Sequence, residues 1–281
     1  MKRPSSINNF PCKLSIVTVC YNEPNLRATC ESIVNQIWQD FEWIVIDGGS
    51  NKKTIDVFDE YKHRMNYFVS EKDNGIYNAM NKGIAKSKGE YICFLNAGDN
   101  YIDNRVLQNV IKKGLDRDII FGDECVVKKG KIKKIRYPNK IDFAYLYRES
   151  LPHQSSFIKR ELFERYGNYD EQYKIVSDWK KWLDFLVLNK CSYKHINLVC
   201  SKFDNSGISS KNNELREKEH AQVLQEYFSN LQLQEIENKT AKKTKELSFR
   251  EKIFSIKTTY DKKHKVITLI GLKIIIKRRI S

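Results

Sequence analysis

Short apolar runs alternate with segments of helical spacing over the first 120 or so residues of the chain. The apolar runs span residues 14–20, 42–47, 67–70, 91–95 and 118–122. Between them, apolar side chains recur every three or four residues, as from Leu26 to Ile37 and from Tyr77 to Ser87. Because the runs are apolar throughout, we expect both faces of each strand to be covered. The pattern predicts an α/β fold with a mostly parallel central sheet and helices on both faces.

The pattern changes after residue 122. A basic stretch at 126–137 predicts a hairpin, and later residues predict a strand near 156–158, helices at 160–166 and 178–188, a strand at 193–199 and a polar helix at 213–233. We therefore divide the chain into an N-terminal extension (1–12), a main domain (13–210) and a helical, basic and amphipathic tail (211–281).

Composition narrows the class of protein. Hydrophobic residues make up 41% of the 281 residues, enough for a sizeable core. No run approaches the ~20 apolar residues that span a bilayer, and the N-terminus shows no apolar signal segment. Seven cysteines without CxxC pairs argue against a disulfide framework and a structural zinc site. We therefore expect a cytoplasmic protein; the oligomeric state stays open.

The net charge of +15 is concentrated at the C-terminus. Residues 239–281 hold 14 Lys and Arg against 3 Asp and Glu, whereas residues 1–238 hold 36 against 32. Apolar residues from Val266 to Ile276 lie among these basic residues, which favours an anionic membrane surface over nucleic acid. We expect peripheral attachment to the inner face of the cytoplasmic membrane and no nucleic-acid partner; a solvated tail with a short strand packed on the body is the alternative.

Polar side chains follow three of the predicted strands. They are Tyr21, Asn22 and Glu23 after the first, Asp47 after the second, and Asn96 to Asp99 after the fourth. Open parallel sheets bind ligands at these carboxyl ends. Neither GxGxxG nor GxxxxGK[ST] is present, which disfavours dinucleotide-binding enzymes and P-loop NTPases. Carboxylates without a phosphate-binding glycine loop indicate that a divalent cation neutralises a diphosphate.

Four stretches together carry a resemblance to a known family: 15–23 (SIVTVCYNE), 43–50 (WIVIDGGS), 71–84 (EKDNGIYNAMNKGI) and 89–99 (GEYICFLNAGD). In this order and spacing the chain resembles family 2 glycosyltransferases of the GT-A fold. It is similar to bacterial enzymes that build O-antigen, capsule or exopolysaccharide. The resemblance covers about residues 13–205 and implies a nucleotide-sugar-binding half (13–122) and an acceptor half (123–210).

The resemblance implies a nucleoside-diphosphate sugar as donor, UDP- or dTDP-linked. The residues it assigns to donor binding are Thr18, Tyr21, Asn22, Glu23, Asp47, Asn81, Lys82 and Asn96. Glu23 matches a contact to a ribose hydroxyl and Asp47 a contact to the base. The alternatives are a turn or helix-capping role for Asp47 and a solvated helix position for Lys82.

Asn96-Ala97-Gly98-Asp99 stands in the place of the Asp-x-Asp motif of the family. The leading Asp is replaced by Asn96, so the resemblance assigns the metal, Mn²⁺ or Mg²⁺, to Asp99. His153 is assigned as a further metal ligand or diphosphate contact, with a purely structural histidine as the alternative. Gln154 beside it is placed on the acceptor side.

Asp178 matches the base of inverting members of the family. An inverting transfer needs one group that deprotonates the acceptor hydroxyl as it attacks. Ser177-Asp178 before an apolar run is also typical of a helix N-cap, and Asp170 is a weaker candidate base. Trp179 is assigned as an acceptor platform, although Trp179 and Trp182 at helical spacing are also typical of a core.

Together these assignments predict an inverting glycosyltransferase that acts on a hydroxyl of a lipid-linked saccharide in bacterial surface polysaccharide biosynthesis. Because Asn96 weakens the motif, a catalytically degenerate nucleotide-sugar-binding subunit of an assembly complex is the alternative. A nucleotidyltransferase would show a glycine-rich loop with basic residues after the first strand, and Tyr21 to Pro24 does not provide one.

Overall fold

The computed structural model of the chain describes residues 12–128, 131–204 and 212–228, and three strands between 254 and 277. The N-terminal extension up to residue 11 and the segment 229–253 lie outside the described residues. The chain divides into two compact units, Met1–His220 and Ala221–Ser281. The division falls ten residues beyond the expected boundary at 210, because α9 (Asn213–Tyr227) begins within the first unit.

The first unit contains a nine-stranded mixed sheet with helices on both faces. Its strands are β1 (Leu14–Cys20), β2 (Phe41–Asp47), β3 (Tyr67–Ser70), β4 (Tyr91–Phe94), β5 (Asn100–Tyr101), β6 (Ile119–Lys128), β7 (Lys131–Ile135), β8 (Ser156–Lys159) and β9 (Tyr193–Asp204). Its other helices are α1 (Leu26–Val34), α2 (Lys52–Tyr61), α3 (Ile76–Lys86), α4 (Val106–Lys113), α5 (Phe143–Leu146), α6 (Arg160–Tyr166) and α7 (Ser177–Trp182). Single 3₁₀ turns lie at Lys62–Arg64 and His153–Ser155, and a π-helical turn at Leu183–Leu188 continues α7.

The strand order is β3-β2-β1-β4-β8-β6-β9-β5, with β7 paired to β6. The pairs β3/β2, β2/β1, β1/β4 and β6/β9 are parallel, which confirms the predicted parallel half. The inserted strand β8 is antiparallel to both β4 and β6. As a result β6 runs in the same direction as β1 and β4, and its middle reaches the edge of the sheet where those strands end.

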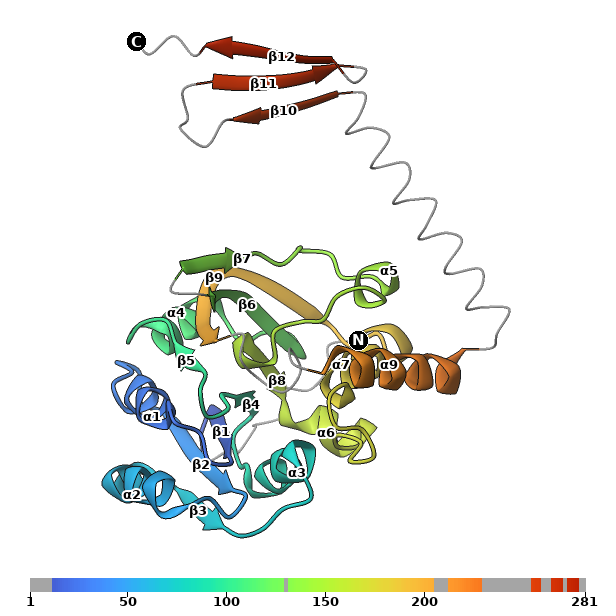
Figure 1. Ribbon diagram of the computed structural model, residues 1–281. Helices are drawn as coiled ribbons and strands as arrows, with labels where there is room; N and C mark the ends of the chain where they lie inside the picture. Colours follow the sequence, from blue (N-terminus) through green and yellow to red (C-terminus); the bar gives the residue numbers. More distant parts are fainter. Residues whose placement is uncertain are drawn as a thin grey trace, which may run out of the picture. The chain divides into compact units, whose positions relative to one another are not determined.

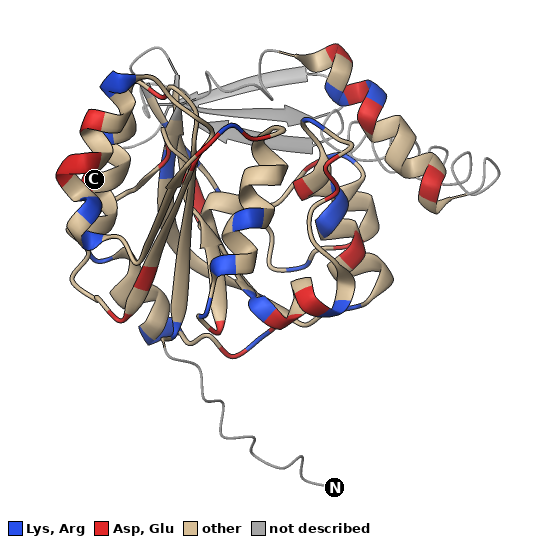
Figure 2. Ribbon diagram, turned by 90° about the horizontal axis from the view of Figure 1, so that it is seen from below, with Lys and Arg blue, Asp and Glu red and all other residues tan. Residues whose placement is uncertain are grey.

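The predicted burial of both faces is confirmed. Figure 1 shows α1, α2 and α4 on one side of the sheet and α3 and α6 on the other. On the first side one hydrophobic cluster joins strand residues such as Trp43 to helix residues such as Cys30, Phe58 and Val110. In Figure 2 the strands are mostly tan, and most charged residues of both signs lie on helices and loops, in keeping with the small net charge of the body.

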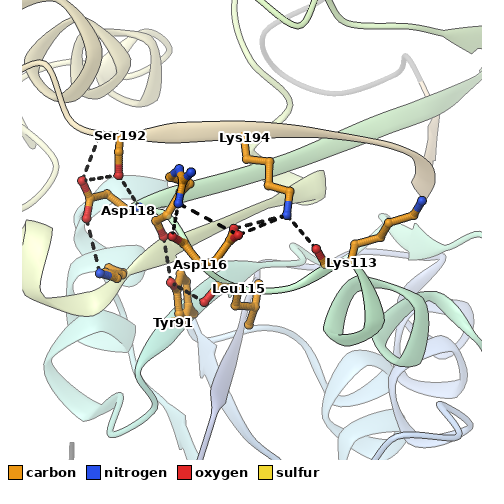
Figure 3. A network of polar contacts seen from close by, with 9 residues as sticks. Tyr91, Lys113, Leu115, Asp116, Asp118, Ser192 and Lys194 are labelled. Atoms are coloured by element: carbon orange, nitrogen blue, oxygen red, sulfur yellow. Dashed lines mark hydrogen bonds and ion pairs between the residues drawn. The ribbon is translucent and has the colours of Figure 1, made fainter. Parts of the chain in front are cut away.

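A polar network closes the opposite edge of the sheet, where β4, β6 and β9 begin (Figure 3). The hydroxyl of Tyr91 lies 2.7 Å from the carbonyl oxygen of Arg117. The carboxylate of Asp118 accepts hydrogen bonds from the backbone N–H and hydroxyl of Ser192, both at 2.8 Å, and Nζ of Lys194 donates to the carbonyl of Lys113 at 2.7 Å. These groups satisfy one another's hydrogen-bonding capacity, so this edge of the sheet has a structural role.

The second unit contains the end of α9, in keeping with a helical tail, and further along the chain three strands, where the sequence leaves helix or strand open. Strands β10 (Phe254–Thr258), β11 (His264–Leu269) and β12 (Leu272–Lys277) form an antiparallel sheet in the order β10-β11-β12. The apolar residues there are largely β-branched, which favours strands over a helix. Across the described residues, the longest apolar helical stretch still falls short of what a membrane crossing requires.

Candidate functional site

The loops after β1 and β2 are joined at the carboxyl edge of the sheet. The backbone N–H of Asn22 donates to Oγ of Ser50 at 2.8 Å, and Oδ1 of Asn22 accepts from the N–H of Asn51 at 2.7 Å. Asn22 has a φ of 52°, a left-handed conformation that asparagine adopts more readily than most residues. Tyr21 beside it is 68% exposed. Asn22 therefore builds this rim, and the Tyr21 ring is available to a ligand.

Asp47 is buried beneath this rim. Its Oδ2 accepts from the N–H groups of Gly49 and Ser50 at 3.2 and 2.9 Å and from the hydroxyl of Ser70 at 2.6 Å. Such a carboxylate organises its own loop, which is the turn role left open by the sequence. Oδ1 accepts from the hydroxyl of Ser50 at 2.5 Å, so contact with a nucleobase, as the resemblance implies, would add to this set or replace one of its members.

Glu23 and Asp99 come together across the loop after β4. Gly98 has a φ of 98°, and a Cβ added there would lie 3.2 Å from Cδ of Glu23, so only glycine fits this approach. Burial raises the pKa of Asp99, the charge of His153 lowers it, and the charges of Glu124 and Glu23 raise it again, to about 7. The structure thus places several carboxylates around one position.

His153 lies between the two halves of the site. Its Nδ1 is 3.5 Å from Oδ2 of Asp178, and its Nε2 is 3.2 Å from Nδ2 of Asn96. In a neutral ring, the Nδ1 proton points to Asp178 and Nε2 accepts from the Asn96 amide. Both ring nitrogens are then occupied, so metal ligation by His153 would require these contacts to break.

Asp178 is held as a carboxylate. Its Oδ1 accepts a hydrogen bond from the hydroxyl of Tyr77 at 2.9 Å. Burial by itself would raise the pKa of Asp178, but the hydrogen bond and charge of His153, together with Tyr77, outweigh it and hold the pKa below its usual value. Burial likewise opposes protonation of His153, but Asp178, Asp99 and Glu124 raise its pKa overall. Asp178 is therefore ionised at neutral pH and able to accept a proton.

Glu124, which the sequence pattern did not single out, is buried next to His153 and Asp99. Glu124 is 4% exposed, and its two oxygens accept from the hydroxyl of Tyr137 and from Nε2 of Gln154, each at 2.6 Å. Burial raises its pKa. The signal that could have identified Glu124 is an acidic residue close to the end of a predicted apolar strand, as at Asp47. Gln154 is thereby committed to Glu124 and positions the turn that carries His153.

Asn81 and Lys82 contact protein groups next to the site. Nδ2 of Asn81 donates to the carbonyl of Tyr169 at 2.9 Å and to Glu171 at 2.8 Å, while its Oδ1 accepts from the N–H of Tyr169 at 3.0 Å. Lys82 forms an ion pair with Glu71 at 2.6 Å. Asn81 therefore links α3 to the second half of the domain. Lys82 stays a candidate for binding the sugar donor, because its ion pair with Glu71 is partly exposed.

Two predicted site residues are in the interior instead. Thr18 is fully buried in β1, where its Oγ1 accepts from Nε1 of Trp43 at 3.0 Å. Trp179 is 2% exposed, and its Nε1 donates to the carbonyl of Leu146 at 2.6 Å. Neither side chain reaches solvent in this structure, so a donor contact by Thr18 or an acceptor platform at Trp179 would require a rearrangement, and Trp179 occupies the core position that its helical spacing also allows.

The residues at the end of β4 fit a divalent cation in part. Oδ1 of Asn96 is buried without a hydrogen-bond partner, and the carboxylate of Asp99 pairs with no described residue. Both are hard oxygen ligands of the kind Mg²⁺ and Mn²⁺ take. No three His, Cys, Asp or Glu side chains within the described ranges form a complete metal site. A cation held by Asn96 and Asp99 would therefore need oxygens from a ligand, as Mg²⁺ commonly takes from phosphates.

Comparison with known proteins identifies the family of the matched region. Residues 15–176 match the family model described as Glycosyl transferase family 2. The chain is 29% identical over 161 residues to a PGL/p-HBAD biosynthesis glycosyltransferase of Mycobacterium bovis, which covers 55% of this chain and 61% of the relative. It is 29% identical over 226 residues to an uncharacterized glycosyltransferase of Rickettsia typhi, with 75% and 71% covered. The chain thus spans about three fifths of the length of the first of these relatives.

Solved structures share the fold. TarS 1–349 of Staphylococcus aureus in complex with UDP-GlcNAc superposes with a TM-score of 0.57 at 15% identity, over 69% of this chain and 59% of that one. The mannosyltransferase PcManGT of Pyrobaculum calidifontis, in complex with GDP-Man and Mn²⁺, has a TM-score of 0.55 at 17% identity, over 76% and 63%. These likenesses confirm the predicted GT-A architecture of the first unit.

Proposed function

Because the chain belongs to glycosyl transferase family 2, we propose that it transfers a sugar from a nucleoside-diphosphate donor to a hydroxyl group, with inversion. The observation that supports this most is an ionised, half-buried Asp178 held across the site from Asp99. One carboxylate is kept ready to accept a proton, and the other has no hydrogen-bond or ion-pair partner among the residues that the structure describes. The structural neighbours bound to UDP-GlcNAc and to GDP-Man support a nucleotide-sugar donor.

The donor would lie over the carboxyl ends of β1, β2 and β4. Tyr21 is exposed there, and Glu23 and Asp99 approach each other across Gly98. Asn96 and Asp99 would hold a divalent cation, which would neutralise the diphosphate and favour its departure. Glu23, Asp99 and Glu124 leave this region with an excess of negative charge, which a cation would offset.

The acceptor would approach Asp178. A single base suffices for inversion, because the hydroxyl oxygen attacks the anomeric carbon as its proton passes to the base. His153 fixes one oxygen of Asp178 and Tyr77 the other, so the carboxylate cannot rotate freely. We propose a lipid-linked saccharide of bacterial surface polysaccharide as the acceptor class, met at an anionic inner membrane surface through the basic tail.

Thermal shift with UDP, GDP, dTDP and CMP, each with and without Mn²⁺, tests donor binding, since a ligand that binds the native state raises its melting temperature. We expect a metal-dependent shift for one diphosphate that Asp99→Asn abolishes. Asp103→Asn is the matched control, because Asp103 is an exposed acid four residues away. Absence of any shift would contradict nucleotide binding altogether, whereas a shift without any sugar transfer would favour the degenerate nucleotide-sugar-binding subunit, the alternative that Asn96 suggests.

Membrane attachment has its own test. The full chain should sediment with anionic liposomes, whereas a chain that ends at Leu233 should remain in the supernatant. Attachment should weaken as salt is raised, because exposed charges are screened beyond about 10 Å at 0.1 M ionic strength. Equal sedimentation of both chains would contradict the role of the tail without affecting the proposed transfer reaction.

A further inference from the structure

Helix α3 and the segment before α7 are joined by a set of hydrogen bonds that the proposed reaction does not itself explain. Nδ2 of Asn78 donates to Glu171 at 2.9 Å, and Asn81 binds Tyr169 and Glu171. Tyr77 lies on the same helix, and its hydroxyl is 2.6 Å from the carbonyl oxygen of Ile175. Helix α3 follows the loop that contains Asp73 and begins after Gly75, so one rigid element connects the donor half of the domain to the other half.

Tyr77, unlike Asn78 and Asn81 on the same helix, contacts the candidate base Asp178. It is 6% exposed, and its hydroxyl lies 2.9 Å from Oδ1 of Asp178 as well as 2.6 Å from Ile175. A phenol has one proton, so it can donate to only one of these two acceptors at a time. An ionised carboxylate is the stronger acceptor, and hydrogen bonds to charged groups are the stronger ones.

We propose that Tyr77 is a positioning residue for the base: its hydroxyl orients Asp178 toward the acceptor and accommodates both protonation states of the carboxylate. This inference rests on the proposed role of Asp178. While Asp178 is ionised, the Tyr77 proton points to Oδ1. When the acceptor hydroxyl gives its proton to Asp178, the Tyr77 proton turns to the carbonyl of Ile175, and no proton is gained or lost by Tyr77.

The position of Tyr77 favours this role over simple packing. Its ring packs on that of Tyr169, with centroids 5.6 Å apart, and Phe at position 77 would keep this contact. Only the hydroxyl distinguishes Tyr from Phe here. His153 approaches Asp178 at the other oxygen and the backbone N–H of Trp179 also binds the carboxylate, so loss of the Tyr77 bond would remove the side-chain hydrogen bond to Oδ1.

The test is a double-mutant cycle with Tyr77→Phe and Asp178→Asn. The rate measured is release of nucleoside diphosphate from UDP-GlcNAc or GDP-mannose with Mn²⁺ and water as acceptor, together with the affinity for UDP or GDP. We expect Tyr77→Phe to lower kcat about ten- to a hundredfold, the effect of one hydrogen bond to a charged group, with nucleotide affinity unchanged. In the Asp178→Asn background, Tyr77→Phe should cause no further loss, because Tyr77 acts through Asp178.

Tyr169→Phe is the matched control, since Tyr169 is buried beside Tyr77 and its hydroxyl has no hydrogen-bond partner among the described residues. It should keep the kcat of the natural chain. A Tyr77→Phe variant with full kcat, or one whose loss is equal in the Asp178→Asn background, overturns the inference while leaving Asp178 in place. A chain in which Asp178→Asn has full activity, or in which neither donor turns over, overturns the proposed base and the inference together.

Discussion

The imidazole of His220 stacks on the indole of Trp179, with ring centroids 3.6 Å apart and 19° between the ring planes. Trp179 follows Asp178 directly, and His220 belongs to α9. The first helix of the expected tail therefore packs on the helix that carries the candidate base. Removal of the part of α9 up to His220 would uncover Trp179, so this part of the helix belongs with the catalytic body.

The same stack predicts how stability depends on pH. Burial lowers the pKa of His220, with a further lowering by Arg216, from 6.5 to about 4. Between these values the unfolded chain binds a proton that the folded chain does not, so the contribution of His220 to the free energy of unfolding falls as the pH decreases below 6.5, while the raised pKa of Asp99 acts in the opposite direction. The expected loss at pH 5 is about 2 kcal/mol. Urea unfolding of the natural chain and of His220→Phe at pH 7 and pH 5 measures this contribution as the difference between the two changes in free energy; equal changes in both chains would contradict the assignment.

Glu219 should stabilise the segment before the base. Its carboxylate is 4% exposed and accepts hydrogen bonds from the N–H groups of Lys174, Ile175 and Val176 at 2.9, 2.9 and 3.3 Å. Glu219→Ala should reduce the free energy of unfolding by about 1–3 kcal/mol, because it leaves buried donors unpaired. Glu217→Ala, at an exposed position two residues earlier, should change it by less than about 0.5 kcal/mol. Similar losses in both would show that Glu219 has no special role.

Two acids compete for the role of base, and substitution separates them. Asp170 forms an ion pair with Lys180 at 2.8 Å, whereas Asp178 faces His153 and Tyr77. Asp178→Asn should lower kcat about 10²- to 10⁴-fold, the usual effect of general-base catalysis, and should leave nucleotide affinity unchanged. Asp170→Asn should keep most of the activity. The reverse pattern in steady-state kinetics would transfer the role to Asp170.

Metal-dependent nucleotide binding should weaken in mild acid. Burial and the nearby carboxylates raise the pKa of Asp99 to about 7, and only the ionised form can hold a cation. Below that pH the apparent affinity for Mn²⁺ should fall by up to about tenfold per pH unit. Calorimetric titration of Mn²⁺ with UDP or GDP present, between pH 5.5 and 8, measures this. A constant affinity over that range would show that Asp99 is not the ligand.

Gly83 fixes how closely α3 approaches the sheet. A Cβ at this position would lie 2.3 Å from Cγ1 of Val17 in β1, and Val17 is fully buried. Gly83→Ala should therefore destabilise the fold by about 1–3 kcal/mol through overpacking. Val17→Ala should recover part of the loss when it is combined with Gly83→Ala, since it removes the clashing methyl group. Additive losses in thermal or urea unfolding would show that α3 does not pack as described.

The early part of the fold could be predicted because its pattern is local. Apolar runs such as 14–20 and 91–95 are long enough to indicate strands, and polar residues mark their ends. Helix α4 was not predicted: Arg105 at its N-cap makes no side-chain capping bond, and its first turn has no acidic residue. The strand β6 extends as a single element through the region predicted as a separate fifth strand and the first arm of a hairpin.

The sequence by itself determined the α/β class, the family and the positions of Asp99 and Asp178, because strand-end polar residues and motif spacing are local properties of the chain. Only the tertiary structure decided that Tyr77 contacts Asp178, 101 residues away, and that Trp179 is inside while Tyr21 is outside. Hydrophobic periodicity predicts which side chains are buried. Which residue each side chain contacts depends on how the helices pack on the sheet. For that reason the sequence did not decide between a core and an acceptor position for Trp179, and Glu124 was overlooked.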